Sequence, residues 1–165
     1  MYEIFPRKND STARNLAAIL FIVAVIAMYL STLPNMPLRS VIQFLSVGLI
    51  ALGLVIMGRY LFSAYAYAIV ARDDGGYDFT VTEIKKRSRI TVCRISGSGI
   101  EKVEILKRGE KERLAALKKG RKIFDYRVDM SPSQYCCIVA EECGEKLVIK
   151  ISYDEKLVSL LSEIE

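Results

Sequence analysis

The chain has 165 residues, of which 52% are hydrophobic and 26% are charged; its mean hydropathy is +0.24 and its formal net charge is +5. This composition is too apolar for an ordinary small soluble domain and too charged for a protein that lies wholly within a membrane, so it predicts apolar spans in one part and a charged globular part in another. The counts of 10 glycines, 4 prolines and 4 cysteines exclude collagen-like, disordered and disulfide-scaffold classes. Histidine is absent, which removes the commonest general base and the commonest neutral metal ligand.

Two charge-free apolar runs near the N-terminus predict a pair of membrane-spanning helices. The first covers 16–33 and would reach roughly 27 Å as a helix, close to the ~30 Å hydrocarbon thickness of a bilayer. The second is charge-free over 41–58, meets Arg59 and continues as an apolar segment, so the span is expected over about 41–62; the polar link PNMPLRS between the runs suits a tight hairpin. We therefore expect a cytoplasmic segment over 1–15, a two-helix transmembrane hairpin over 16–64 and a cytoplasmic domain over 66–165.

Two other interpretations of these runs stay open. Each run could be the buried core helix of a soluble protein, since length and apolarity alone do not separate the two cases. The first run could also be a cleaved signal peptide, although it is longer than the usual apolar region and no small-residue cleavage site follows it.

The basic residues that flank the runs predict the orientation of the hairpin. They are Arg7, Lys8 and Arg14 before the first run, Arg39 in the link, and Arg59 and Arg72 after the second run. Because Lys and Arg collect on the cytoplasmic side, this bias predicts a multi-pass protein of the cell membrane with both termini in the cytoplasm. A face of small residues on the first span predicts close packing of the two spans and no particular oligomeric state. It consists of Ala17, Ala24, Ala27 and Ser31.

After the apolar runs the sequence changes to short alternating segments that are typical of strands. Turn sequences such as DDGG and SGSG separate them, and β-branched residues alternate with polar ones within them. We expect seven strands, at 66–72, 77–83, 89–95, 100–106, 123–130, 134–141 and 145–151.

Two helices are expected within this domain. Gly109 and Gly120 bracket the sequence EKERLAALKK, in which two leucines share one face. Near the C-terminus, Ser152 and Glu155 have the spacing of a capping box before a final helix. The apolar stripe of this helix consists of Leu157, Leu160, Leu161 and Ile164. We expect that stripe to be buried against the open end or seam of a small β-barrel.

The order of four strands, an inserted helix, three strands and a closing helix resembles the pleckstrin-homology-like (PH-like) domain. The chain is similar to bacterial membrane proteins in which such a domain follows a pair of transmembrane helices. The resemblance covers 66–165, and its most characteristic segment is EKLVIKISYDEKLVSLL. It implies an α+β fold: the hairpin plus a PH-like seven-stranded β-barrel or sandwich that the C-terminal helix closes.

Basic residues cluster in two parts of this domain. One or both clusters are expected to contact anionic lipid headgroups. The larger one consists of Lys107, Arg108, Lys111, Arg113, Lys118, Lys119, Arg121 and Lys122. The smaller one lies at the expected turn between the second and third strands and consists of Lys85, Lys86, Arg87 and Arg89. The alternative is that both are solvated surface, as many lysine-rich turns are. Neither cluster has interleaved aromatic residues, so nucleic acid is not an expected partner.

No catalytic, metal-binding or cofactor-binding motif accompanies these features. The sequence contains no nucleophile elbow and no Walker-type loop, and SGSG precedes a strand, whereas a phosphate-binding loop precedes a helix. We expect Cys93, Cys136, Cys137 and Cys143 to be reduced, and the adjacent pair to point to opposite faces of a strand as small apolar side chains.

Two functions are compatible with these observations. The first is a membrane-anchored PH-like module that binds or scaffolds protein partners or anionic headgroups and has no catalytic activity. The alternative is an accessory subunit of a membrane transporter or enzyme complex, which acts through its transmembrane helices. An enzyme that acts alone is the third interpretation, and no expected site supports it.

Overall fold

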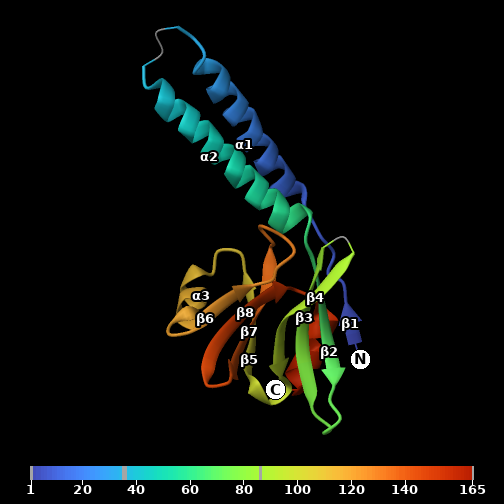
Figure 1. Cartoon of the computed structure of the whole chain (residues 1–165). Helices are drawn as coiled ribbons and strands as arrows, with labels where there is room; N and C mark the ends of the chain where they lie inside the picture. The colour runs from blue at the N-terminus through green and yellow to red at the C-terminus, as the bar shows by residue number, and fades with distance from the viewer. Residues whose placement is uncertain (1, 35–36, 86, 165) are drawn as a thin grey trace. The chain divides into compact units, whose positions relative to one another are not determined.

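The computed structural model describes residues 2–34, 37–85 and 87–164. The chain divides into two compact units (Figure 1): Asn9–Ser63 form a helical hairpin, and Met1–Lys8 join Ala64–Glu165 in a β-rich body. The hairpin contains α1 (Ser11–Leu30), α2 (Arg39–Ile56) and the π-helical turn η1 (Met57–Leu61). The strands of the body are β1 (Tyr2–Ile4), β2 (Ala64–Ala71), β3 (Tyr77–Lys85), β4 (Ser88–Ser96), β5 (Ile100–Lys107), β6 (Lys122–Asp125), β7 (Gln134–Glu142) and β8 (Glu145–Ser152). Its helices are η2 (Gly97–Gly99), α3 (Lys111–Lys118) and α4 (Glu155–Ile164).

The two long helices of the hairpin pack against each other through small residues. Ala17, Ala24 and Ser31 of the predicted small face are buried, whereas Ala27 is half-buried. Small side chains let two helix backbones approach closely. In a bilayer the lipid tails are as apolar as the helices, so helices associate there mainly through this close packing. The prediction of a small-residue interface is confirmed for these three positions.

Most of the apolar surface of the hairpin is exposed. Both α1 and the continuous helix formed by α2 and η1 are long and apolar enough to cross a membrane. In the most apolar 18-residue windows of these two helices, 17% and 11% of the residues are buried. The core helix of a soluble protein is mostly buried, so these helices are candidate membrane spans.

The ends of α1 differ from the predicted span because hydrogen bonds, and not apolarity, define them. The helix begins at Ser11, before the apolar run starts, and the Oδ1 atom of Asn9 accepts hydrogen bonds from the backbone N (3.3 Å) and hydroxyl (2.7 Å) of Ser11. At the other end the hydroxyl of Ser31 donates to the carbonyl of Met28 (2.6 Å). Compared with the predicted span 16–33, the helix therefore begins earlier, at Ser11, and ends earlier, at Leu30.

Two four-stranded sheets form the described part of the body. Sheet A has the strand order β1-β2-β3-β4, with every neighbouring pair antiparallel. Sheet B has the order β5-β7-β8-β6, in which β6 pairs with β8 in parallel and the other pairs are antiparallel. The α+β class is therefore shown, and the described strands form two separate sheets where a closed barrel was one expectation.

Each sheet contains one strand that the sequence did not predict correctly. The N-terminal segment was expected to lie outside the domain, yet its strand β1 extends sheet A, with Ile4 opposite Tyr67. The expected strand 123–130 is shorter in the structure and ends at Asp125, whose carboxylate accepts hydrogen bonds from the backbone and guanidinium of Arg127. The regular strand ends there, although the chain keeps two further hydrogen bonds to β8, from the backbone N of Tyr126 to the carbonyl of Lys150 (2.8 Å) and from the backbone N of Val128 to the hydroxyl of Ser152 (3.0 Å).

The main core lies between the two sheets and α4. Its fully buried members include Tyr67 and Phe79 from sheet A, Ile138 from sheet B and Leu157 and Leu161 from α4. The predicted stripe of the C-terminal helix is thus buried at these two leucines, and the side chain of its last member, at 164, lies outside the described side chains. Sheet packing with a helix at one end removes both apolar faces from water.

The start of α4 corrects one prediction. Ser152 was expected to cap this helix, but it is the last residue of β8, and its hydroxyl accepts a hydrogen bond from the backbone N of Val128 (3.0 Å). The carboxylate of Asp154 accepts from the backbone N of Leu157 (3.0 Å) and so caps the helix. Strand β8 extends to Ser152, further than the predicted capping box allowed, and the capping residue is therefore Asp154.

Candidate functional site

The larger basic cluster lies around α3 on the outer face of sheet B. Gly109 (φ 107°) and Gly120 (φ 71°) turn the chain on either side of this helix in a backbone conformation that favours glycine. Leu114 and Leu117 pack against a second, smaller apolar cluster formed by β5, β7 and β8. The two leucines thus hold α3 on the sheet, and its charged residues surround that contact, as the sequence predicted.

Three of the eight predicted headgroup residues are engaged in ion pairs with the body. These pairs join Arg113 to Glu104 (3.2 Å) and Glu110 (3.1 Å), Arg121 to Glu101 (3.7 Å), and Lys122 to Glu145. The hydrogen bond from Lys102, together with the charges of Lys102 and Arg113, holds the pKa of the Glu104 carboxyl below its usual value. These three cations are therefore partly compensated before any ligand arrives.

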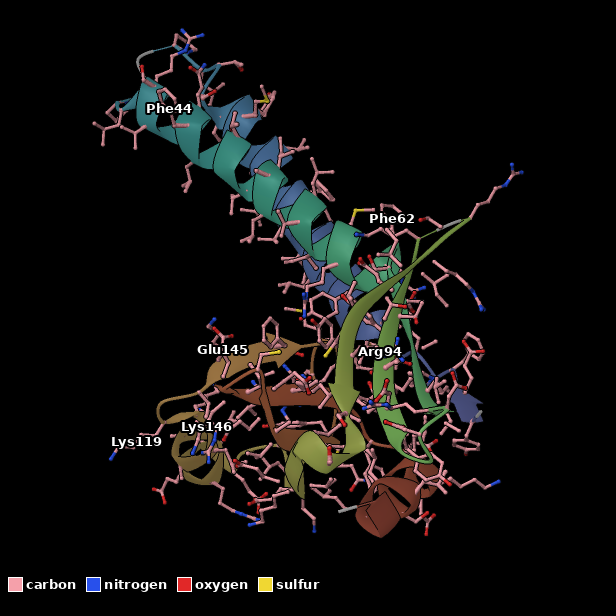
Figure 2. All side chains as sticks on the ribbon, turned by 60° about the horizontal axis from the view of Figure 1, so that its bottom comes forward. Phe44, Phe62, Arg94, Lys119, Glu145 and Lys146 are labelled. Atoms are coloured by element: carbon pink, nitrogen blue, oxygen red, sulfur yellow. The ribbon has the colours of Figure 1, made fainter. Side chains whose placement is uncertain are left out.

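The other five have no ion pair among the residues that the structure describes; they are Lys107, Arg108, Lys111, Lys118 and Lys119. Lys119 extends outward from the end of α3 (Figure 2). Burial, and then the charge of Lys118, lowers the pKa of Lys150 on the sheet beneath, although the nearby Asp125 carboxylate opposes this effect. The predicted site therefore divides into three cations paired with carboxylates of the body and five without such a pair, of which Lys118 is half-buried and the others are exposed.

The smaller basic cluster lies at the turn between β3 and β4. Lys85, Arg87 and Arg89 are exposed there, and Lys86 lies outside the described residues. Lys85 pairs with Glu83 (2.9 Å). The guanidinium of Arg89 lies 5.6 Å from the centre of the Phe5 ring and 3.6 Å from a carboxylate oxygen of Glu3. The N-terminal segment thus contributes an aromatic ring and a counter-charge to this cluster, which sequence reasoning missed.

The strand register places this turn at the end of sheet A where the chain arrives from the hairpin. Ala64, the first residue of β2, is opposite Ile84, and Ile84 is opposite Arg89. Strand β1 runs antiparallel to β2, so the chain that follows Ile4 continues toward the same end before it reaches Asn9 and the hairpin. Both covalent connections between the two units therefore leave sheet A at its basic end.

The opposite end of sheet A carries acidic groups. The buried carboxylate of Asp78 accepts a hydrogen bond from Arg94 (2.6 Å) and lies 3.6 Å from Arg72, which also pairs with Asp74 (2.8 Å). A shallow depression of about 360 Å³ is lined by Ala71, Arg72, Asp73, Asp74 and Arg94. Because the arginines there already have carboxylate partners, this depression offers a ligand little uncompensated charge.

A buried polar network joins the two sheets near β6. The hydroxyl of Tyr67 donates to the carbonyl of Tyr126 (2.7 Å) and accepts from the backbone N of Ser152 (3.1 Å). Burial raises the pKa of Tyr67 to about 12, so this hydroxyl stays protonated and can donate. Burial opposes ionisation of Asp125, but the hydrogen bonds and charge of Arg127 outweigh it and lower the pKa of that carboxyl. These groups fix the chain between β6 and β7 and have a structural role.

The cysteines of the body occupy different environments. Cys136 faces the main core and Cys137 the outer cluster beneath α3, which confirms that the pair points to opposite faces of β7. Burial raises the pKa of the thiol to about 12 at Cys136 and to about 11 at Cys137 and Cys93, so the nucleophilic thiolate is disfavoured at neutral pH. Cys143 is exposed in the turn between β7 and β8. Across residues 2–34, 37–85 and 87–164, no group of three or more Cys, Asp or Glu could hold a metal ion.

Comparisons with known proteins found no match. No family model, no curated protein and no solved structure matches the chain.

Proposed function

We propose that this chain is a two-span protein of the cell membrane that displays a PH-like body on the cytoplasmic side. The body would bind protein partners or anionic lipid headgroups and act as a scaffold without catalysing a reaction. The hairpin would be its anchor, and the exposed basic residues and free sheet edges of the body would be its contact surface.

The single observation that carries this proposal is the exposed apolar surface of the hairpin. Phe44 of α2, labelled in Figure 2, is 80% exposed, and Val25 and Val55 are each 65% exposed. Each large apolar side chain left in water forgoes about 1.5–3 kcal/mol, so a soluble protein does not expose a whole pair of helices in this way. A bilayer would cover this surface without a partner protein.

The orientation that we propose follows from the charges at the two ends of the hairpin. Arg7 and Lys8 precede α1 and Arg14 lies in its first turn, whereas at the other end of the hairpin the basic residue is Arg39, the first residue of α2. The positive-inside rule then places the link outside and both termini in the cytoplasm. The body follows the second span, so it would lie on the cytoplasmic side with its cysteines reduced.

Two features of the body support a PH-like fold. Antiparallel strands β2, β3 and β4 pack face to face with the antiparallel strands β5, β7 and β8, and the C-terminal helix α4 closes the core between them. The body also departs from the simplest PH-like arrangement, because β1 extends sheet A and β6 lies parallel at the edge of sheet B. In our proposal β1 is an addition to the seven strands that the resemblance implies, and β6 is the fifth of those seven strands.

Replacing the hairpin, residues 9–63, with an unrelated two-span hairpin tests the function. Proteins that contact the chain would be identified by crosslinking in native membranes and pull-down, with the natural hairpin as the reference. A scaffold that acts through its body keeps the same partners after the exchange. Loss of every partner would contradict the proposal and support the alternative, an accessory subunit that acts through its transmembrane helices.

A further inference from the structure

The structure contains two basic surfaces, and only one of them is held at the point where the body joins the hairpin. We propose that the basic end of sheet A, defined here as Phe5, Lys85, Arg87 and Arg89, docks on the anionic headgroups of the inner leaflet. This inference rests on the proposed function, because it requires that the hairpin spans the membrane. It assigns the lipid contact to the turn between β3 and β4, one of the two basic segments that the sequence offered for it, in place of the larger segment 107–122.

The first argument is the length of the connection. Only Phe62 and Ser63 separate the end of η1 from Ala64, the first residue of β2. Three residue steps extend at most about 11 Å, so this end of sheet A cannot move far from the last residue of the candidate span. Paired strands lie about 4.8 Å apart, and Ala64 is opposite Ile84, next to Lys85. The covalent chain therefore keeps the basic turn within reach of a membrane surface, whatever angle the body adopts.

The second argument is the charge difference along sheet A. The exposed side chains of Lys85, Arg87 and Arg89 lie at the end that joins the hairpin, and they outnumber the two carboxylates paired with them, those of Glu83 and Glu3. Asp73 and Asp74 are exposed in the turn between β2 and β3, at the other end of the sheet. Strand β3 extends between these ends for 9 residues, or about 30 Å, which is several times the ~8 Å Debye length at physiological ionic strength. An anionic surface would attract the first end without repelling the second.

The third argument is the apolar side chains that accompany these cations. Phe5 is 56% exposed beneath the guanidinium of Arg89, and Ile90 is 57% exposed beside it in the sequence. Aromatic rings and basic side chains together are typical of the headgroup region, where a ring has an apolar body to bury and a cation has phosphates to contact. The segment 107–122 lacks this combination, because Leu114 and Leu117 already pack on sheet B.

The experiment uses the full chain in nanodiscs of phosphatidylcholine, with or without phosphatidylglycerol. A fluorophore is attached either to native Cys143 or to Ser88→Cys in a Cys143→Ser background, and lipids with a headgroup quencher report its distance from the surface. Ser88 is exposed at the basic end, whereas Cys143 follows Glu142, whose carboxylate contacts the backbone N of Ser96 at the opposite end (3.3 Å). We expect strong quenching at Ser88→Cys that depends on phosphatidylglycerol and decreases at high salt, and little quenching at Cys143.

Two charge-matched variants test which surface makes the contact. Lys85→Gln/Arg87→Gln removes two cations from the basic end, and Lys118→Gln/Lys119→Gln removes two cations without ion pairs from the end of α3. At about fivefold per side chain, the equivalent of ~1 kcal/mol each, the first variant should lower the docking equilibrium about 25-fold, and the second should leave it unchanged.

The opposite result, with docking lost in the α3 variant alone, would overturn the proposal and return the contact to 107–122. Quenching at Ser88→Cys that is equal with and without phosphatidylglycerol would also overturn it. The charge-reversed variant Lys85→Glu/Arg87→Glu should abolish docking, and unfolding curves that match the unaltered chain show that each variant is folded. Failure here leaves the proposed function standing, because the hairpin exchange tests that function with a separate readout.

Discussion

Removing one buried hydroxyl tests how the two sheets are joined. Tyr67 is fully buried, and its hydroxyl connects the carbonyl of Tyr126 to the backbone N of Ser152. Tyr67→Phe keeps the ring but leaves both backbone groups without this partner. A buried polar group without a partner costs about 1–3 kcal/mol, so we expect the body to lose roughly 2–4 kcal/mol of stability.

The assay is thermal unfolding of the full chain in detergent, followed by the β-sheet signal in circular dichroism. For a body of this size, 2 kcal/mol corresponds to a decrease in Tm of about 8 °C or more. Tyr77→Phe is the matched control, because Tyr77 is 49% exposed. A decrease in Tm no larger for Tyr67→Phe than for Tyr77→Phe would refute the role that we assign to this hydroxyl.

Three further predictions concern the cap of α4, the hairpin and acid stability. Asp154→Ala should lower the free energy of unfolding by about 1 kcal/mol in denaturant titrations, because it removes the helix cap. An unchanged free energy of unfolding would show that Asp154 does not cap the helix. Gly53→Val should destabilise the hairpin by about 1–3 kcal/mol, measured by the helical signal in detergent, since a Cβ at Gly53 would lie 3.0 Å from the ring of Phe21. Gly48→Val is its control, with no atom within 4 Å of the added carbon, and an equal effect of the two would contradict the packing. The folded state lowers the pKa of Asp125, so its contribution to stability is present above the unfolded-state value of about 4 and is lost as the pH falls through the folded value. Asp125→Asn should therefore make stability less dependent on pH in this acidic range, and an unchanged profile would exclude that carboxylate as a cause.

Sequence periodicity predicted the parts of this molecule that local patterns determine. The alternation in QYCCIVAE placed Cys136 and Cys137 on opposite faces, and the spacing of Leu114 and Leu117 placed the buried side of α3. Both predictions were correct, because a side chain's direction along a strand or helix depends on its own position in the element. The two candidate spans were evident for a similar reason, since length and apolarity are local properties.

The features that the sequence did not predict depend on partners far along the chain. Strand β1 has 3 residues, too few for a periodic pattern, and it is a strand only because β2 is available to pair with it. The parallel pairing of β6 with β8 likewise joins residues that are far apart in the chain, such as Lys122 and Leu147, and no local pattern shows it. The capping box failed because β8 extends to Ser152 in pairing with β7.

The candidate site likewise combines features that local patterns predict with features that depend on long-range pairing. Both basic clusters were visible in the sequence, and their sizes favoured the segment 107–122. The pairing of Ala64 with Ile84 is what connects the smaller cluster to the end of the hairpin, and that register could not be predicted. Phe5 stands in the short sequence FPRK, where a proline and two basic residues follow the aromatic one, and this was the available signal for the lipid contact that we propose.

The central claim is that the chain crosses the bilayer twice and leaves its body on the inner side. Labelling of intact cells with a membrane-impermeant maleimide tests it directly, because Cys143 is exposed on the body. Thr32→Cys, in the link after α1, is the positive control for the outer side. Our account predicts that Thr32→Cys reacts in intact cells and that Cys143 reacts only after the membrane is permeabilised. Reaction of Cys143 in intact cells would contradict it.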